Sequence, residues 1–208
     1  ECARENGDLV SERKGAIWRT LRLHGRPAHA GADTHRGRSA VSALAQEIVR
    51  IEALSAGRSE MTSVITTVHG GDSANTVPGE ALATIDIRSS VPEDLVFALA
   101  ELKRDGAYDG VTGEIEDRGT WPPMPRTPWL VDLARSLATE LGLEVGEQHS
   151  GGVSDGCWTG DDGVPTIDGL GPVGGDDHTP SEWIEIATLE ARIELAARLV
   201  TAIVQRGP

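Results

Sequence analysis

The sequence predicts a protein of mixed α/β and α+β class, because two different patterns follow each other along the chain. Residues 16–118 contain strand and helix patterns in the order β-α-β-β-α-β, which is the order of a split ferredoxin-like unit. Residues 119–208 contain amphipathic helices on either side of a glycine-rich stretch with one short apolar strand, as in part of an α/β layer. A chain of 208 residues can form one domain or two small ones and is long enough to bury a core.

Alternating apolar and polar residues mark the strands of the first part, and apolar residues at helical spacing mark its helices. The strand patterns cover residues 16–23, 61–68, 81–88 and 111–115. The first helix is expected over residues 38–54, and the second opens at Pro92. The expected core stripes are Val41, Leu44, Ala45, Ile48 and Ile51 in the first helix and Leu95, Leu99 and Leu102 in the second.

The second part begins after a proline-rich segment, residues 121–128. A helix is expected over residues 129–141, since Gly142 just past its end suits a helix C-terminus. Residues 164–168 read as a brief buried strand, and a loop rich in glycine and proline follows it. The last helix is expected over residues 187–205, with a core stripe of Leu189, Ile193, Ala196, Val200 and Ile203.

Composition excludes several classes of partner. Asp plus Glu number 33 against 19 Lys plus Arg, a formal charge of -14, so we expect neither nucleic acid nor an anionic membrane surface as a partner. The two cysteines, Cys2 and Cys157, are too few for a disulfide framework and suit free thiols in a reducing, cytoplasmic compartment. No apolar run approaches the ~20 residues of a membrane span. The chain begins with Glu1 rather than Met, so an upstream targeting signal stays an open question.

Taken alone, the polar residues of the loops do not decide between a structural and a functional role. His178 lies in a glycine-rich loop, where a histidine is either a solvated side chain or a metal or catalytic group. His29, Asn75 and Arg88 are a loop histidine, a turn asparagine and a strand arginine, which are more often structural or solvated than functional.

One short pattern points to another class of enzyme. Residues 152–156 fit G-x-S-x-G, and Asp168 and His178 follow Ser154 in the order of an α/β-hydrolase triad. That pattern needs a buried strand directly before it, whereas residues 146–151 are polar and flexible. A serine hydrolase using Ser154 is therefore the remote alternative.

Longer motifs at both ends of the chain resemble a known family. GGVSDG, GVPTIDGLGPVGG and HTPSEW, within residues 151–183, resemble the C-terminal signature of the zinc aminoacylase/carboxypeptidase family, which includes glutamate carboxypeptidase, acetylornithine deacetylase and succinyl-diaminopimelate desuccinylase. The start, ECAREN to RKG, resembles another motif of that family, with Cys2 where proline is usual. The resemblance implies that Glu1 and His178 are zinc ligands and that Gly151 and Gly152 lie beside the substrate.

The same resemblance extends to residues 16–118, whose loops GRPAHAG and GGDSANTVPG look like those of the family's lid, or dimerisation, domain. It implies that His29 reaches across a homodimer and polarises the scissile carbonyl, while Asn75 and Arg88 hold the substrate carboxylate. It also implies that the lid is inserted into a partial catalytic α/β domain formed by residues 1–15 and 119–208. Dimerisation is expected through the first long helix of the lid and its neighbouring strand.

Two motifs of the family are absent from this chain. A two-zinc site needs a bridging carboxylate, further ligands and a carboxylate base, which the family supplies from a His-x-Asp pair and a Glu-Glu pair. The residues two positions after the histidines are Arg26, Gly31, Gly37, Gly71, Gly151 and Pro180, and no Glu-Glu occurs.

The sequence therefore predicts the C-terminal part of a di-zinc hydrolase that cleaves an amide bond next to a carboxylate. The expected substrate is a small peptide or an N-acyl amino acid. Because the zinc site is incomplete, we expect the chain alone to be inactive. The alternative is a non-catalytic dimerisation or ligand-binding module.

Overall fold

The computed structural model describes residues 1–104 and 108–206, which form two compact units. Residues 1–14 and 123–208 make up the first unit, and residues 15–122 make up the second. The described residues contain no helix that is both long and apolar enough to cross a membrane.

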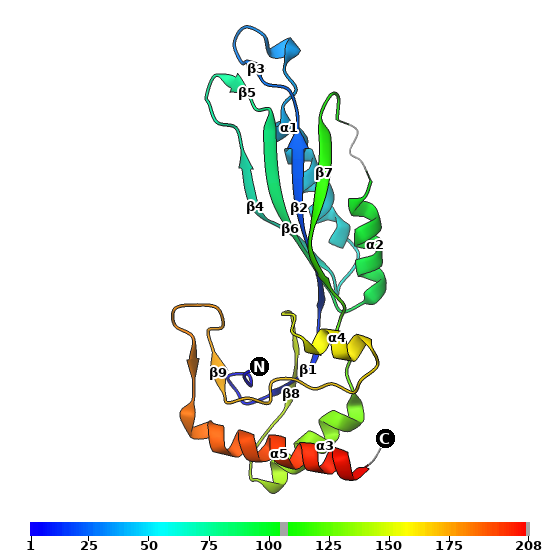
Figure 1. Cartoon of the computed structure of the whole chain (residues 1–208), viewed down its shortest axis with the longest axis vertical. Helices are drawn as coiled ribbons and strands as arrows, with labels where there is room; N and C mark the ends of the chain where they lie inside the picture. The colour runs from blue at the N-terminus through cyan, green and yellow to red at the C-terminus, as the bar shows by residue number, and fades with distance from the viewer. Residues whose placement is uncertain (105–107, 207–208) are drawn as a thin grey trace. The chain divides into compact units, whose positions relative to one another are not determined.

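A four-stranded antiparallel sheet forms the centre of the unit of residues 15–122 (Figure 1). Its spatial order is β4-β6-β2-β7. The strands are β2 (Gly15–His24), β4 (Thr62–Gly70), β6 (Glu80–Ser89) and β7 (Thr112–Trp121). The order along the chain with its two helices is the ferredoxin-like order, which confirms the mixed fold class. The fourth strand extends six residues beyond the predicted end, to Trp121.

Two helices cover one face of this sheet, α1 (Ala40–Glu52) and α2 (Pro92–Leu102). Alternate residues of β2 and β6, such as Leu21 and Ile85, are buried against them. Short 3-10 turns, Thr34–Arg36 and Ala53–Ser55, flank α1. Two further short strands, β3 (Ala28–His29) and β5 (Thr76–Val77), pair with each other beyond the sheet.

The predicted stripe of α1 is only partly correct. Leu44 and Ile51 are buried, but Val41 and Ala45 are exposed, and the buried face includes Glu47 instead. The helix has apolar residues both on the face that contacts the sheet and on an adjacent exposed face. The predicted stripe therefore includes residues of both faces.

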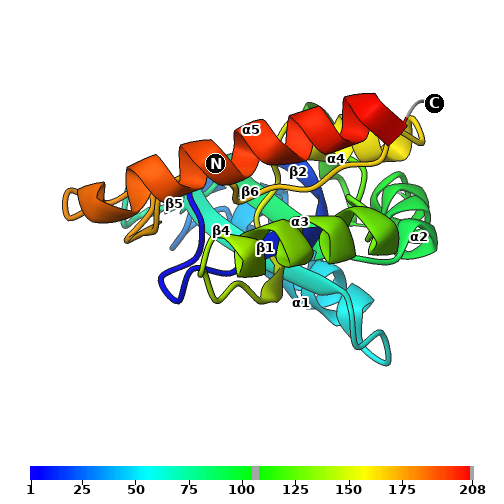
Figure 2. The same cartoon turned by 90° about the horizontal axis from the view of Figure 1, so that it is seen from below.

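The other unit is built on two parallel strands, β1 (Leu9–Arg13) and β8 (Glu147–Ser150). Leu9 packs against two helices that run side by side, α3 (Pro128–Glu140) and α5 (Leu189–Arg206) (Figure 2). Val10 packs with Met124 and Cys157, the latter on the short helix α4 (Gly156–Asp161). The remaining elements are β9 (Gly174–Gly175), β10 (Trp183–Ile184) and the 3-10 turn Ile186–Thr188.

Two predictions for this unit are wrong. Residues 164–168 form no buried strand, because only Asp168 bridges to Val10 while Val164 is 54% exposed. The core stripe of α5 is Arg192, Leu195 and Leu199, whereas Ile193 and Val200 of the predicted stripe are each 61% exposed. The helix itself begins two residues later than predicted and runs to Arg206.

Candidate active-site residues

The N-terminal segment runs beside the segment that leads to His178. The Glu1 carbonyl accepts a hydrogen bond from the Gly171 N–H at 3.0 Å, and Ala3 bridges in parallel to Val173. Further along, Arg4 Nη1 lies 3.5 Å from Asp177 Oδ2. Two stretches about 170 residues apart in sequence are therefore neighbours in one unit, and each carries one of the two predicted metal ligands.

His178 lies in the loop between β9 and β10, and its backbone is unusual. Asp176 and His178 have φ values of 58° and 65°, in the left-handed region that residues other than glycine rarely occupy. Hydrogen bonds from the His178 N–H to Glu182 Oε2 and from the Thr179 N–H to the Asp176 carbonyl hold this conformation. Strained backbone of this kind costs of order 1–3 kcal/mol per residue and is concentrated at functional sites.

The donor set near these residues does not form a complete zinc site. Across residues 1–104 and 108–206, no three His, Cys, Asp or Glu side chains gather closely enough to hold a metal ion. A structural or catalytic zinc ion needs three or four protein ligands. Glu1 and His178 would therefore have to be completed by ligands from elsewhere.

A buried polar network fixes the loop that carries the glycine pair. Arg13, whose side chain is only 4% exposed, places Nε and Nη2 each 2.9 Å from Asp168 Oδ2. Its Nη1 donates to the Gly152 carbonyl at 3.0 Å, and Ser154 Oγ donates to Asp168 Oδ2 at 2.7 Å. A side chain added at Gly151 would meet no atom within 4 Å, so the backbone there borders open space. The network thus holds the loop while its glycines stay accessible.

Burial opposes the ionisation of Asp168, but the hydrogen bond from Ser154 and the charge of Arg13 keep the pKa of this carboxyl below its usual value. Asp168 is therefore a carboxylate at neutral pH and the partner of a guanidinium.

This arrangement does not support the serine hydrolase alternative. Ser154 Oγ donates to Asp168 and accepts from the Gly156 N–H, where α4 begins. Among the described residues, neither Ser154 nor Asp168 is hydrogen-bonded to a histidine, which a triad requires.

In the other unit, the structure brings His29 and Asn75 together. The Ala30 N–H donates to the Asn75 carbonyl at 2.8 Å, and His29 pairs with Thr76 across β3 and β5. His29 Nδ1 accepts hydrogen bonds from the Gly31 and Ala32 N–H groups, at 3.1 and 3.2 Å. The neutral imidazole then carries its proton on Nε2, as an exposed donor.

Arg26 and Arg36 line a hollow of about 260 Å³ together with His29. Sequence reasoning did not single out these arginines, because isolated arginines in a loop carry no motif. With Asp33, which also lines the hollow, they give the surroundings of His29 a formal charge of about +1.

Arg88 lies away from this pair. β6 begins at Glu80, close in sequence to β5 and Asn75, and Arg88 lies eight residues further along the strand. A strand rises ~3.3 Å per residue, so roughly 26 Å separates Arg88 from Glu80. Its Nε and Nη2 donate to the two carboxylate oxygens of Asp86 at 2.9 and 2.8 Å. The hydrogen bonds that Arg88 donates to Asp86 raise the pKa of Arg88. The structure therefore does not place Arg88 with His29 and Asn75.

Comparison with known proteins identifies one domain of the chain. Residues 11–105 match the family model described as the peptidase dimerisation domain of the M20 peptidases. The chain thus contains an M20 peptidase dimerisation domain, and the family resemblance that the motifs indicate is confirmed.

Two relatives by sequence carry the names of hydrolases. The chain is 29% identical to N-carbamoyl-L-amino-acid amidohydrolase of Rhizobium meliloti, over 93% of this chain and 49% of that protein. It is 28% identical to succinyl-diaminopimelate desuccinylase of Bordetella parapertussis, over 88% of this chain and 50% of that protein. The chain therefore spans about half the length of the curated relatives it matches.

Solved structures share the fold. Aminopeptidase PepT of Bacillus cereus superposes with a TM-score of 0.80 at 24% identity, over 96% of this chain and 54% of that chain. A tripeptidase of Staphylococcus aureus gives a TM-score of 0.78 at 22% identity, over 99% of this chain and 56% of that chain.

Proposed function

We propose that the chain is the C-terminal part of a di-zinc hydrolase that cleaves an amide bond next to a carboxylate, in a small peptide or an N-acyl amino acid. The observation that carries this proposal is the placement of the Glu1 segment beside the segment that leads to His178. The names of two relatives, an N-carbamoyl amino acid amidohydrolase and a succinyl-diaminopimelate desuccinylase, support the substrate class.

Each predicted site residue has a specific part in this proposal. Glu1 and His178 each contribute one ligand to a zinc centre that other residues complete. His29 is the catalytic residue of this chain, because a fixed Nε2–H donor aimed at a carbonyl oxygen stabilises the charge that develops there in the transition state. Gly151 and Gly152 offer backbone groups beside the substrate.

Asn75 and Arg88 complete the proposed substrate-binding set. Asn75 is held beside His29 by the β3 and β5 pairing. Arg88 would meet a substrate carboxylate with fewer than its full set of donors, because Asp86 already engages Nε and Nη2.

The chain alone is expected to be inactive, since its own residues do not make a complete zinc site. The test is an assay of the isolated chain with an N-carbamoyl amino acid, an N-succinyl amino acid and a dipeptide, each with added ZnCl2. We expect hydrolysis no faster than in the buffer control. Robust zinc-dependent turnover would overturn this part of the proposal.

We also propose that the chain forms a homodimer through α1 and β4. β4 is an edge strand of the sheet, and among the described residues its outer side pairs with no other strand. Val41 and Val49 on α1 are 37% and 71% exposed, and Val68 on β4 is 50% exposed. Val68 pairs with the buried Ala83, so it lies on the helix-covered face of the sheet, as α1 does. A second copy related by a two-fold axis would bury the same residues on both sides.

The Val49→Asp variant is expected to weaken the dimer about a hundredfold, because it places one unpaired carboxylate on each side of a symmetric apolar interface. Val96→Asp is the matched control, since Val96 on α2 is 68% exposed but belongs to another surface. Sedimentation equilibrium measures both. Equal dissociation constants for the two variants would place the dimer interface elsewhere, and a monomeric parent chain would contradict dimerisation itself.

A non-catalytic dimerisation or ligand-binding module is the second candidate, favoured by the incomplete set of metal ligands. The gene sequence upstream of the Glu1 codon separates the two candidates. A His-x-Asp and a Glu-Glu motif in the same reading frame support the hydrolase, and a reading frame without them supports the module. We further propose a cytoplasmic location, because Cys2 and Cys157 are both free.

A further inference from the structure

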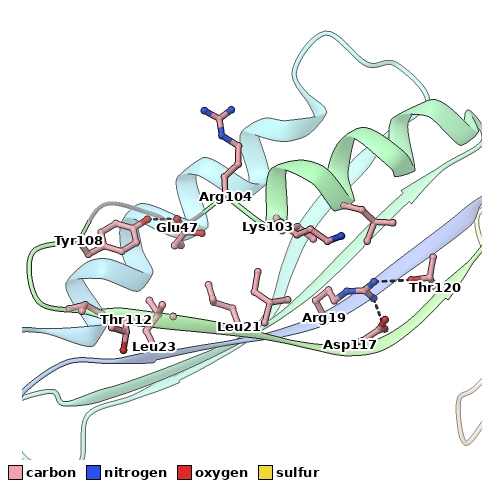
Figure 3. Close-up of a pocket in the computed structure, with 15 residues that line it drawn as sticks. Arg19, Leu21, Leu23, Glu47, Lys103, Arg104, Tyr108, Thr112, Asp117 and Thr120 are labelled. Carbon is pink, nitrogen blue, oxygen red and sulfur yellow. Dashed lines mark hydrogen bonds and ion pairs between the residues drawn. The ribbon is translucent and has the colours of Figure 1, made fainter.

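An open groove of about 850 Å³ lies between the helices and the strands of the 15–122 unit, at the β2 and β7 side of the sheet (Figure 3). Pockets that bind small molecules have volumes of ~300–1,000 Å³. This groove is separate from His29 and Asn75, since neither residue lines it.

The groove exists because the helices do not cover the whole sheet. α1 and α2 pack over β4, β6 and β2, whereas the side chains of β7 are exposed or half-exposed along the strand. Leu21 pairs with Ile115 and Leu23 pairs with Gly113 across β2 and β7, but the two leucines are core residues, only 3% and 2% exposed. The accessible apolar lining is therefore Ile115, which is 37% exposed, with the half-buried Leu99 and Val111. Gly113 has no side chain to fill the space, and a Cβ there would lie 2.9 Å from Leu23 Cδ2. The result is an apolar floor with α2 as one wall.

Both ends of the groove are closed by polar groups that already have partners. At one end, Arg19 Nη1 lies 2.8 Å from Asp117 Oδ1, and Nη2 donates to Thr120 Oγ1 at 2.9 Å. At the other end, Glu47 accepts hydrogen bonds from Arg50 and from the Tyr108 hydroxyl. Each end is thus close to neutral, so neither provides a strong site for a charged group.

Lys103 is the exception among the charged groups of the groove. Its ammonium makes no ion pair with any residue that the structure describes, whereas Arg104 pairs with Glu101 at 3.0 Å. In Figure 3, Lys103 extends between α2 and the strands above Arg19, while Arg104 extends away from the strands. A groove with an apolar lining and a lysine that pairs with no carboxylate of residues 1–104 and 108–206 stands out in a chain with a formal charge of -14.

The free edge of β7 is poorly suited to receive an added peptide strand. The register of β2 and β7 shifts between Trp18 and Arg19, which inserts Arg118 as an extra residue in the edge strand. Arg19 fixes this bulge by donating to the Trp18 and Gly119 carbonyls, at 2.7 and 2.9 Å. Bulges and charged side chains protect sheet edges from strand addition. A small molecule is therefore a better occupant than an extended peptide.

We propose that this groove binds a small organic monoanion with an apolar body, such as an aryl- or alkyl-carboxylate. The apolar body lies on Ile115, Leu99 and Val111, and the carboxylate pairs with Lys103. This site is independent of the proposed hydrolase function, because it uses none of the residues of that function.

The test compares 4-phenylbutyrate with 4-phenylbutylamine, which have the same apolar body and opposite charges, by calorimetry and by amide chemical shifts of the 208-residue chain. We expect shift changes at Gly113, Ile115 and Lys103, and binding of the carboxylate about tenfold tighter than that of the amine. Lys103→Glu should weaken binding of the carboxylate about fivefold, so that the amine binds more tightly than the carboxylate. Arg118→Glu makes an equal charge change on an exposed side chain outside the groove. It should change the dissociation constant of either ligand by no more than about twofold.

A filling variant tests the apolar floor. Ile115→Phe places a larger side chain in the groove at a position that is already 37% exposed, so the fold should tolerate it. We expect it to weaken both ligands about tenfold with an unchanged thermal midpoint. The proposal is overturned if the carboxylate causes no shift changes in the groove, if the amine binds equally well, or if Ile115→Phe binds like the parent.

Discussion

Arg13→Ala is expected to destabilise the unit of residues 1–14 and 123–208 by about 3–5 kcal/mol, because removing one partner of a buried ion pair leaves the other charge unpaired. Asp168 would keep the hydrogen bond from Ser154 but lose two guanidinium contacts at 2.9 Å. The Gly152 carbonyl would lose its donor as well. Hydrogen exchange of the Val10 amide, which donates to the Asp168 carbonyl, reports the loss within this unit.

The matched control is Arg126→Ala. Arg126 also donates two hydrogen bonds to a carboxylate, that of Glu147, both at 2.8 Å, and lowers the pKa of Glu147 to about 2. Its side chain is 33% exposed and that of Glu147 is 26% exposed, against 4% and 12% for Arg13 and Asp168. An ion pair that solvent reaches to this extent contributes below about 1 kcal/mol. Equal losses of unfolding free energy in the two variants would show that burial does not determine how much the Arg13–Asp168 pair contributes to stability.

The same pair predicts a pH dependence. Because the pKa of Asp168 is lowered in the folded protein, its carboxylate stabilises the fold above the pH at which an unfolded aspartate titrates, about 4. That contribution is lost as the pH falls through the lower folded pKa. The parent protein should therefore lose protection of the Val10 amide at acidic pH more steeply than Arg13→Ala does. A parallel loss in both proteins would assign the acid sensitivity to other groups.

Leu195→Ala is expected to destabilise the same unit by about 2–5 kcal/mol, since Leu195 on α5 is fully buried and its removal leaves a cavity. Ile193→Ala, two residues earlier on the same helix and 61% exposed, should change the free energy of unfolding by less than about 0.5 kcal/mol. Both substitutions leave alanine in the helix, so helix propensity does not explain a difference of this size. Denaturant unfolding followed by amide exchange of α5 measures both.

This comparison decides between two registers of α5. The sequence pattern places Ile193 in the core, whereas the structure places Leu195 there. A larger loss for Ile193→Ala than for Leu195→Ala would mean that the helix is rotated relative to the structure described above.

The two misassigned helices show where periodicity stops being informative. In both α1 and α5, apolar residues occupy a buried row and an exposed row, and the hydrophobic pattern alone does not tell which row meets the sheet. The short strand predicted at residues 164–168 failed for a related reason. Its residues are apolar and β-branched enough for a strand, but only Asp168 forms a strand-type bridge, with Val10, whereas the Val164 N–H donates to the Thr159 carbonyl of α4. By contrast, for strands with strict alternation, such as β2 and β6, both ends of the strand were predicted to within two residues.

The site was accessible from the sequence only through motifs. Motif resemblance singled out Glu1, His29, Asn75, Arg88, Gly151, Gly152 and His178, and spacing alone decided none of them. The network of Arg13, Ser154 and Asp168 was missed because 155 residues separate Arg13 from Asp168, so no local pattern connects them. The available signal was that Arg13 and Asp168 lie inside the two motifs that carry the resemblance. The pairing of Arg88 with Asp86 was also missed, although residues two positions apart on one strand lie on the same face of the sheet.

Zinc titration of the isolated chain, followed by its thermal midpoint, tests the central claim that this chain supplies only Glu1 and His178 to a shared metal centre. A ligand stabilises the folded state by RT ln(1 + [L]/Kd), so a complete site raises the midpoint at micromolar zinc, whereas a site with two protein ligands does not. The account predicts no shift at micromolar zinc for the parent chain or for His178→Ala. A clear rise in the parent chain that His178→Ala abolishes would contradict it, because the chain would then hold a complete zinc site of its own.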